Sequence, residues 1–113
     1  MSDDCVFCRI VRKDISVELV HDGEECIAFR DANPQAPIHF LVIPRAHIPT
    51  LNDARDAALV GRLSLVAAEL AKRDGVAESG YRIVMNTNGA AGQTVFHLHL
   101  HVLGGRSLSW PPG

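Results

Sequence analysis

Three of the six histidines in this 113-residue chain fall within five positions. They alternate with aliphatic residues in the run His97-Leu98-His99-Leu100-His101-Val102-Leu103. In a strand, every second side chain shares a face at a spacing of about 6.6 Å, so the imidazoles would lie on one face and the aliphatic side chains on the other. Imidazole can act as a nucleophile, a proton carrier or a metal ligand near neutral pH. The spacing therefore predicts a site where two or three imidazoles contact one phosphate-sized group.

The segment before this run is small, polar and contains glycine: Asn86-Thr87-Asn88-Gly89-Ala90-Ala91-Gly92-Gln93-Thr94. Such a loop lets backbone N–H groups approach an anion without side chains in the way. It would also bring Thr94 close to His97. It is not a P-loop, because it lacks the Gly-Lys-Ser/Thr ending, and taken alone it is better explained as an ordinary Asn/Gly turn between two strands.

The three cysteines are Cys5, Cys8 and Cys26. An odd number of cysteines argues against a disulfide framework. Cys5 and Cys8 have the spacing of half a zinc site, with two ligands missing. The alternative is a pair of free thiols on a short helix. Cys26 lies among apolar residues and is expected in the core.

Composition predicts one small domain over residues 1–113. The chain is 47% hydrophobic and has a formal net charge of −2. It therefore offers no basic field for nucleic acid, which we exclude as the main partner. Residues 1–4 lack the features of a signal peptide, and no apolar run approaches the roughly 18 residues of a membrane span. These observations predict a cytoplasmic protein with no membrane partner.

Apolar periodicity predicts the elements that must position the histidines. Helices are expected over residues 5–12 and along a stripe formed by Leu59, Leu63, Val66 and Leu70, with Asn52 or Asp53 as the cap of the second. Lys72 and Arg73 precede Gly75 at its end. Strands are expected over residues 18–21, 26–31, 39–44, 81–86 and 95–103. Short turns and one long helix indicate an α+β domain with a largely antiparallel sheet.

The histidine run resembles the pattern His-x-His-x-His, followed by apolar residues, of the histidine-triad (HIT) family of nucleotide hydrolases and transferases. The resemblance extends over nearly the whole chain. It is carried by Cys5-Val6-Phe7-Cys8-Arg9-Ile10, Ala28-Phe29-Arg30-Asp31, and Pro37-Ile38-His39-Phe40-Leu41-Val42-Ile43-Pro44 with His47. The tail from Gly104-Gly105-Arg106 to Trp110-Pro111-Pro112-Gly113 is similar to the Hint branch of the family.

This resemblance implies a HIT-like fold with a five-stranded sheet, one long helix and one short helix. It also implies a homodimer in which two such sheets join across the long helix and the central strands. The C-terminal tail, residues 104–113, would reach the partner's active site, with Trp110 as a contact. A frayed terminus is the alternative for this tail.

The resemblance implies a purine nucleoside phosphoramidase that converts a nucleoside 5′-phosphoramidate to the monophosphate and an amine. His99 matches the nucleophile, and the backbone carbonyl of His97 matches the acceptor of its proton. His101 would stabilise charge on a phosphate oxygen, and Thr94 would assist at the phosphate or leaving group, a position more often occupied by serine. Three alternatives stay open: hydrolysis of dinucleoside polyphosphates, nucleotide binding with vestigial catalysis, and a catalytic metal held by the triad. Histidine catalysis requires no cofactor and should survive EDTA, whereas metal-dependent hydrolysis should not.

The same resemblance implies a nucleoside site. Asp31 matches the carboxylate that accepts the ribose hydroxyls. Apolar walls around a purine match Phe7, Ile10, Phe29 and Leu41, although core packing alone would explain Ile10 and Leu41. Phosphate and ribose contacts match Asn86, Gly92, Val95 and the backbone of Gln93 and Thr94. Arg30 occupies a pocket position that is often histidine in Hint proteins, which affects base preference.

The resemblance also implies a structural zinc ion. In family members with the cysteine pair, the positions that match His47 and His97 complete the set begun by Cys5 and Cys8. Other Hint proteins lack these cysteines and do without the metal.

Overall fold

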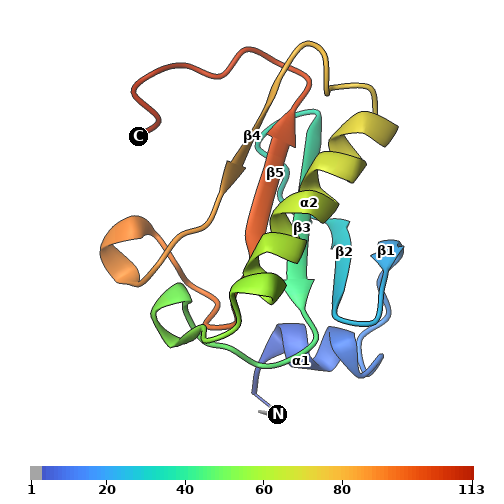
Figure 1. The fold of residues 1–113 in the computed structure, drawn as a ribbon, viewed down its shortest axis with the longest axis vertical. Coiled ribbons are helices and arrows are strands. Elements are labelled where there is room, and N and C mark those ends of the chain that lie inside the picture. The colour runs from blue at the N-terminus through green and yellow to red at the C-terminus, as the bar shows by residue number, and fades with distance from the viewer. Residues whose placement is uncertain (1–3) are drawn as a thin grey trace.

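A five-stranded antiparallel sheet forms the centre of the computed structural model, which describes residues 4–113 (Figure 1). The strands are β1 (Leu19–Asp22), β2 (Cys26–Arg30), β3 (Ile38–Pro44), β4 (Tyr81–Val84) and β5 (Leu100–Gly104), in the spatial order β1-β2-β3-β5-β4. All neighbouring pairs are antiparallel. With one long and one short helix, this confirms the predicted α+β class. Residues 1–3, which form most of the segment without signal-peptide features, lie outside the described residues.

The two helices pack against different parts of the sheet. α2 (Ala57–Arg73) lies across one face (Figure 1) and buries Leu63, Val66 and Leu70 of the predicted stripe against β3 and β5, whereas Leu59 is half-buried. α1 (Val6–Val11) joins a second cluster, made of Phe7, Ile10, Ile27, Phe29, Leu41 and Ile43. Alternation along β3 explains the division, since Phe40 and Val42 belong to the first cluster while Leu41 and Ile43 belong to the second. Cys26 is buried in the first cluster, as expected.

The long helix starts later than predicted. Its N-cap is Asp56, whose Oδ1 accepts hydrogen bonds from the N–H groups of Ala58 at 3.0 Å and Leu59 at 3.2 Å. Asn52 and Asp53 instead lie in a separate 3-10 turn, which Thr50 caps. The prediction that Asn52 or Asp53 caps the long helix was wrong, because both residues belong to this preceding turn. Within residues 4–113, no helix has the length and apolar character needed to cross a bilayer.

The strand of the histidine run is shorter than predicted, since β5 begins at Leu100 rather than at residue 95. Upstream of it, the N–H of Leu98 donates to the carbonyl of Ile48 at 2.6 Å, in the loop after β3. β4 likewise ends at Val84 rather than at residue 86. His97 and His99 therefore lie on an irregular approach to the sheet, and only His101 lies within β5.

Candidate active site and cysteine–histidine cluster

The protonation of His99 follows from one hydrogen bond. Its Nδ1 lies 2.8 Å from the backbone oxygen of His97. A carbonyl oxygen can only accept, so Nδ1 carries the proton and Nε2 of the neutral ring keeps its lone pair. The His99 side chain is almost buried but retains 9% exposure. This arrangement leaves Nε2 available as a nucleophile.

A chain of hydrogen bonds likewise fixes the proton on His101. The backbone N–H of Gln35 donates to Nδ1 of His39 at 3.0 Å, so the proton of neutral His39 sits on Nε2. That Nε2 lies 2.9 Å from Nδ1 of His101 and donates to it. The proton of His101 is therefore on its own Nε2. Because the His99 and His101 rings are 5.1 Å apart, a nucleophilic nitrogen and a hydrogen-bond donor belong to adjacent rings.

Burial keeps both rings of this chain neutral. It lowers the pKa of His101 to about 4, with further lowering by His99 and His39 and an opposing effect of Asp31. Burial also lowers the pKa of His39, again against the effect of Asp31. Both residues are thus neutral at pH 7, as the Gln35–His39–His101 chain requires.

His39 is a site residue that the sequence reasoning missed. It was noted only as part of an apolar strand, although strand alternation places it on the same face as Leu41. Leu41 pairs with His101 across β3 and β5, so His39 lies diagonally beside the triad. A lone histidine within an aliphatic strand was the available signal, but its partner depended on the strand order.

The ring of His97 does not share the face of His99 and His101. Its Nε2 donates to the carbonyl of Pro44 at 2.8 Å, and the side chain is fully buried. Burial lowers its pKa, so the neutral ring presents an unprotonated Nδ1. The expectation that all three imidazoles lie on one face was therefore wrong for His97, because the chain turns its ring toward the cysteines before β5 begins.

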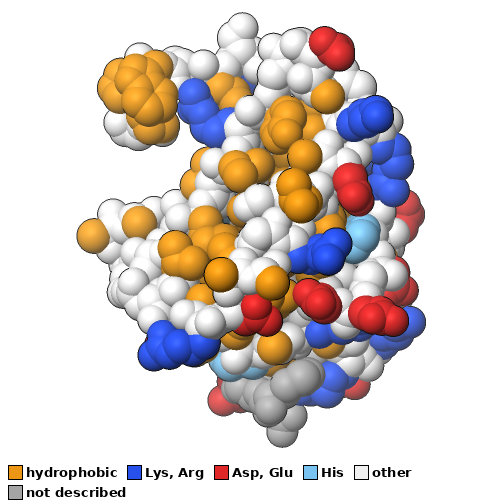
Figure 2. All heavy atoms as spheres, in the orientation of Figure 1, with side chains coloured by type: hydrophobic (Ala, Val, Ile, Leu, Met, Phe, Trp, Pro, Cys, Tyr) orange, Lys and Arg blue, Asp and Glu red, His pale blue; other side chains and the backbone are white. Residues whose placement is uncertain are grey.

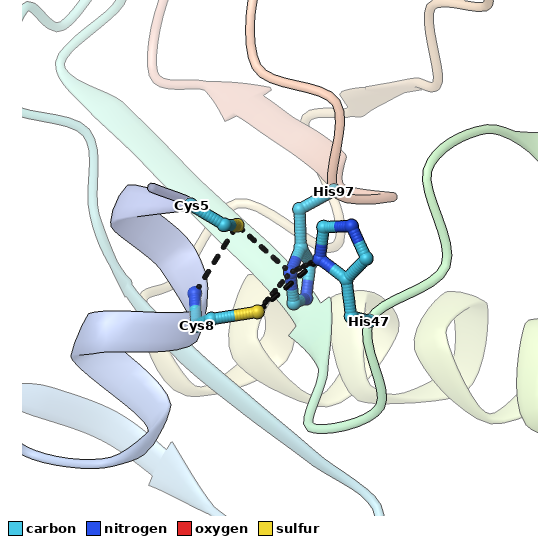
Figure 3. Close-up of side chains that lie close together, drawn as sticks. All are labelled: Cys5, Cys8, His47 and His97. Atoms are coloured by element: carbon cyan, nitrogen blue, oxygen red, sulfur yellow. Dashed lines mark hydrogen bonds between the residues drawn. The ribbon is translucent and has the colours of Figure 1, made fainter. Parts of the chain in front are cut away.

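The four predicted metal ligands converge in one cluster (Figure 3). Nδ1 of His97 lies 3.3 Å from Nδ1 of His47, 3.4 Å from Sγ of Cys5 and 3.6 Å from Sγ of Cys8. Sγ of Cys8 lies 3.2 Å from Nδ1 of His47. A tetrahedral zinc ion with ordinary bond lengths would separate its ligands by about 3.3 Å between two nitrogens and about 3.6 Å between nitrogen and sulfur. The donor types and spacings fit zinc.

Asp31, His39 and His101 form a second group of potential ligands, with donor atoms within 4.8 Å of one another. Proton placement distinguishes it from the cysteine cluster. A metal at Nε2 of His39 would move the ring proton to Nδ1, where it would oppose the N–H of Gln35. In the cysteine cluster, by contrast, the Pro44 carbonyl holds the His97 proton on the outer nitrogen. The proton placement in the second group therefore favours hydrogen bonds between its rings over metal binding.

The predicted purine walls lie together beside the histidines. The ring of Phe7 lies edge-on to those of Phe29 at 5.7 Å and His99 at 5.2 Å. Ile10 and Leu41 belong to the same cluster, and Val95 packs against it. Phe7, Ile10, Phe29 and Leu41 are each at most 7% exposed, so they contribute to the packing of the domain as well as to any pocket.

The predicted ribose ligand, Asp31, stands at the end of β2. Its Oδ1 accepts from the N–H of Asn33 at 2.8 Å, and its Oδ2 lies 3.4 Å from Nε2 of His39. The carboxylate is half-buried, so it combines a fixed orientation with access from solvent.

The polar loop before the triad is organised by the side chain of Gln93. This side chain is 4% exposed, and its Oε1 accepts from the N–H of Asn88 at 2.8 Å. Its Nε2 donates to the carbonyls of Pro49 at 2.8 Å and Val95 at 3.1 Å. Gly92 adopts a φ of 92°, which favours glycine. The resemblance implied only backbone contacts at Gln93, so the role of its side chain was not predicted. Asn86 is half-buried and Thr94 is exposed.

Arg30 is not a pocket residue, and that expectation was wrong. Its guanidinium lies 4.9 Å from the ring centre of Phe40 and 3.6 Å from the carboxylate of Asp74, just beyond α2. Strand alternation explains the result, because Arg30 points to the sheet face opposite to that of Phe29 and Asp31.

Trp110, in the tail, is 80% exposed and so does not pack into its own domain.

Known proteins are similar to this chain in sequence and in architecture. Residues 12–108 match the model of the HIT domain. The chain is 50% identical to an uncharacterized HIT-like protein of Synechococcus elongatus over the full length of both. It is 46% identical to the purine nucleoside phosphoramidase of Escherichia coli, with 96% of this chain and 92% of that protein covered. The structure of a HIT family hydrolase from Legionella pneumophila superposes with a TM-score of 0.94 at 46% identity, covering 97% of this chain and 100% of that one. The protein therefore belongs to the HIT family.

Proposed function

We propose that the protein hydrolyses purine nucleoside 5′-phosphoramidates to the nucleoside monophosphate and an amine. The observation that carries this proposal is the bond from Nδ1 of His99 to the carbonyl of His97, which leaves an unprotonated Nε2 beside His101. The similarity to the purine nucleoside phosphoramidase of Escherichia coli supports the reaction class.

In the first step, Nε2 of His99 attacks the α-phosphorus. A P–N bond to the ring forms and the P–N bond to the amine breaks, while the leaving nitrogen takes a proton from the medium. The ring becomes a cation that keeps its proton on Nδ1, where the His97 carbonyl stabilises it. His101 donates from Nε2 to a non-bridging phosphate oxygen.

In the second step, water attacks the same phosphorus and releases a proton to the medium. The bond between phosphorus and Nε2 breaks, and its electron pair returns to the ring. The products are the nucleoside monophosphate and neutral His99, ready for another cycle.

The nucleoside would bind beside this centre. We assign the ribose hydroxyls to Asp31 and the purine to the cluster around Phe7, Ile10, Phe29 and Leu41. The phosphate and ribose would meet the loop that Gln93 organises, through Asn86, Gly92, Gln93, Thr94 and Val95. The exposed Thr94 hydroxyl would act at the phosphate or leaving group.

A structural zinc ion at Cys5, Cys8, His47 and His97 is part of the proposal. The tetrahedral spacing of the donors and the inward lone pair of His97 support it. Such an ion would tie the start of α1 to the segment that holds the nucleophile. Phe7 and Ile10 lie on α1, so the same ion would anchor part of the purine site.

We further propose that the protein acts as a homodimer. β4 is an edge strand with exposed Tyr81 and Ile83, and Phe96 and Trp110 are exposed as well. Figure 2 shows the end of the tail standing away from the body of the molecule, with apolar side chains on the surface beside the gap. A second copy would cover such surface, which is costly to leave in water.

The cytoplasmic location stays a prediction, which cell fractionation would test.

The deciding experiment is release of AMP from adenosine 5′-phosphoramidate in EDTA, comparing wild type with His99→Ala. We expect turnover by the wild type alone, with nucleotide binding retained by the variant. An active His99→Ala protein would refute the covalent mechanism. If the wild type bound AMP but released none from the phosphoramidate, the reaction class would be wrong, and dinucleoside polyphosphates would be tested next.

A further inference from the structure

The guanidinium of Arg106 donates hydrogen bonds to the carbonyl of Gln35, a residue 71 positions earlier in the chain. Its Nε donates to that oxygen at 3.1 Å and one terminal nitrogen donates at 2.9 Å. Its other terminal nitrogen donates to the carbonyl of Ser107 at 2.9 Å. The guanidinium is thus fixed between the start of the tail and the loop before β3.

The backbone next to Arg106 also lies against that loop. Gly105 has a φ of 88°, and a Cβ at this position would lie 3.0 Å from Cβ of Pro37. Glycine therefore permits both the left-handed turn and the close approach. The end of β5 and the loop before β3 are held together by this contact and by the Arg106 guanidinium.

Gln35 links the histidines to this clamp, by which we mean the hydrogen bonds from the Arg106 guanidinium to the Gln35 carbonyl. While its carbonyl accepts from Arg106, its N–H donates to Nδ1 of His39 at 3.0 Å. Nε2 of His39 then donates to Nδ1 of His101 at 2.9 Å. Arg106 is therefore connected to the triad in three steps: it binds the carbonyl of Gln35, the N–H of Gln35 binds the ring of His39, and that ring binds His101.

The Gln35 N–H sets the direction of the proton chain at Nδ1 of His39, and Oδ2 of Asp31, 3.4 Å from Nε2 of His39, favours the same direction. In the opposite direction, His39 would carry its proton on Nδ1, and Nε2 would accept a proton from Nδ1 of His101. Nε2 of His101 would then present a lone pair to an anionic phosphate. The Gln35 N–H disfavours that state, because it would place two donors against each other.

We propose that Arg106 is a positioning residue that holds the Gln35 N–H against His39 and so keeps a proton on Nε2 of His101. The expected effect on catalysis rests on the proposed function, whereas the expected placement of protons on the His39 and His101 rings does not. Without the clamp, His39 and His101 would sample both proton directions, and fewer molecules would present a donor to the phosphate. We expect kcat to fall more than KM rises, because the donor acts on charge that develops during reaction.

The test compares Arg106→Ala with Arg55→Ala. Arg55 is an exposed arginine that also donates to backbone carbonyls, those of Asn52 at 3.2 Å and Ala54 at 3.3 Å. It therefore controls for the loss of one charge and two such contacts. We expect kcat/KM for adenosine 5′-phosphoramidate to fall about tenfold in Arg106→Ala, less than the roughly hundredfold loss that a 1 Å misplacement of a reacting group can cause, and to stay within about twofold in Arg55→Ala.

Nitrogen-15 NMR of the histidine rings supplies the readout that separates positioning from general structural support. In wild type, Nδ1 of His39 should resonate as an unprotonated nitrogen and Nε2 of His101 as a protonated one. In Arg106→Ala both signals should move toward tautomer averages, while those of His97, bound to Pro44, stay in place. Gln35→Pro removes the N–H itself and should shift the His39 and His101 signals further than Gln35→Ala, which retains it.

Wild-type-like signals from His39 and His101 in Arg106→Ala would overturn the proposal, whatever the activity. A protonated Nδ1 of His39 in the wild type would overturn it without any variant, so a variant that fails to fold leaves the proposal testable. If the wild type lacks phosphoramidase activity but the ring signals respond to Arg106→Ala, the proposed function fails and the positioning role stands.

Discussion

His97 serves two neighbours through two different groups, since its carbonyl accepts from Nδ1 of His99 at 2.8 Å while its ring faces the thiols of the cysteine cluster. The backbone of one residue therefore sets the protonation of the nucleophile, and its side chain anchors the same segment to α1. The cluster and the nucleophile are adjacent parts of one structure.

This connection predicts that losing a cysteine ligand weakens catalysis without abolishing it. Cys8→Ala should lose the zinc that we expect at one ion per chain, and kcat/KM should fall about tenfold because the His97 carbonyl is held less firmly. Zinc content and steady-state rates check this. The matched control is Cys26→Ala, since Cys26 is buried in the other core cluster and should leave zinc content unchanged. Full zinc content in Cys8→Ala would contradict the assignment.

Acidic solution should destabilise the protein through His101. Its pKa is lowered from 6.5 to about 4, so between these values the unfolded chain binds more protons than the folded one. The free energy of unfolding should then fall as pH drops from about 6.5 to 4, with about 2 kcal/mol lost by pH 4.5 from this residue. Urea unfolding at pH 7 and pH 4.5 measures the loss.

The control for that measurement is His101→Gln, which can still accept a hydrogen bond from His39 but does not titrate. Carboxylates and the other histidines contribute equally to both proteins, so the difference between their pH slopes isolates His101. Identical slopes for the two proteins would show that the His101 pKa is not lowered.

Gln93 should matter for stability more than its place in a loop suggests. Gln93→Ala leaves the N–H of Asn88 and the carbonyls of Pro49 and Val95 without their partner, which should cost about 1–3 kcal/mol of unfolding free energy. Gln35→Ala removes an exposed side-chain bond to the carbonyl of Asn33 and should cost less than about 0.5 kcal/mol. Urea denaturation compares them, and equal losses would refute the role of Gln93.

Base preference should be insensitive to Arg30. Because its guanidinium lies over Phe40 on the α2 side of the sheet, Arg30→His should leave the ratio of kcat/KM for adenosine and guanosine phosphoramidates within about twofold of wild type. Phe29→Leu, one position earlier on the opposite face, is the comparison and should lower both values by removing an aromatic wall. A selectivity change in Arg30→His alone would restore the pocket interpretation.

The order of helices and strands could be predicted from the sequence, because apolar periodicity and turn residues are local signals. The spacing of the histidines likewise indicated His99 and His101. The spacing of Cys5 and Cys8 indicated half of a zinc site, whereas the other two members of the cysteine–histidine cluster, His47 and His97, came from the resemblance to the HIT family. No local pattern joins Cys5 and Cys8 to His47 and His97.

The direction in which each ring faces, and the nitrogen that carries the proton of His39, His97 and His101, required the folded chain. For His99 the resemblance had already implied the carbonyl of His97, but the other states depend on the carbonyl of Pro44 and on the N–H of Gln35, and every residue has such backbone groups. Their partners are therefore set by strand order and loop path rather than by residue type. For the same reason the roles of His39, Gln93 and Arg106 emerged only when β3 and β5 were placed side by side.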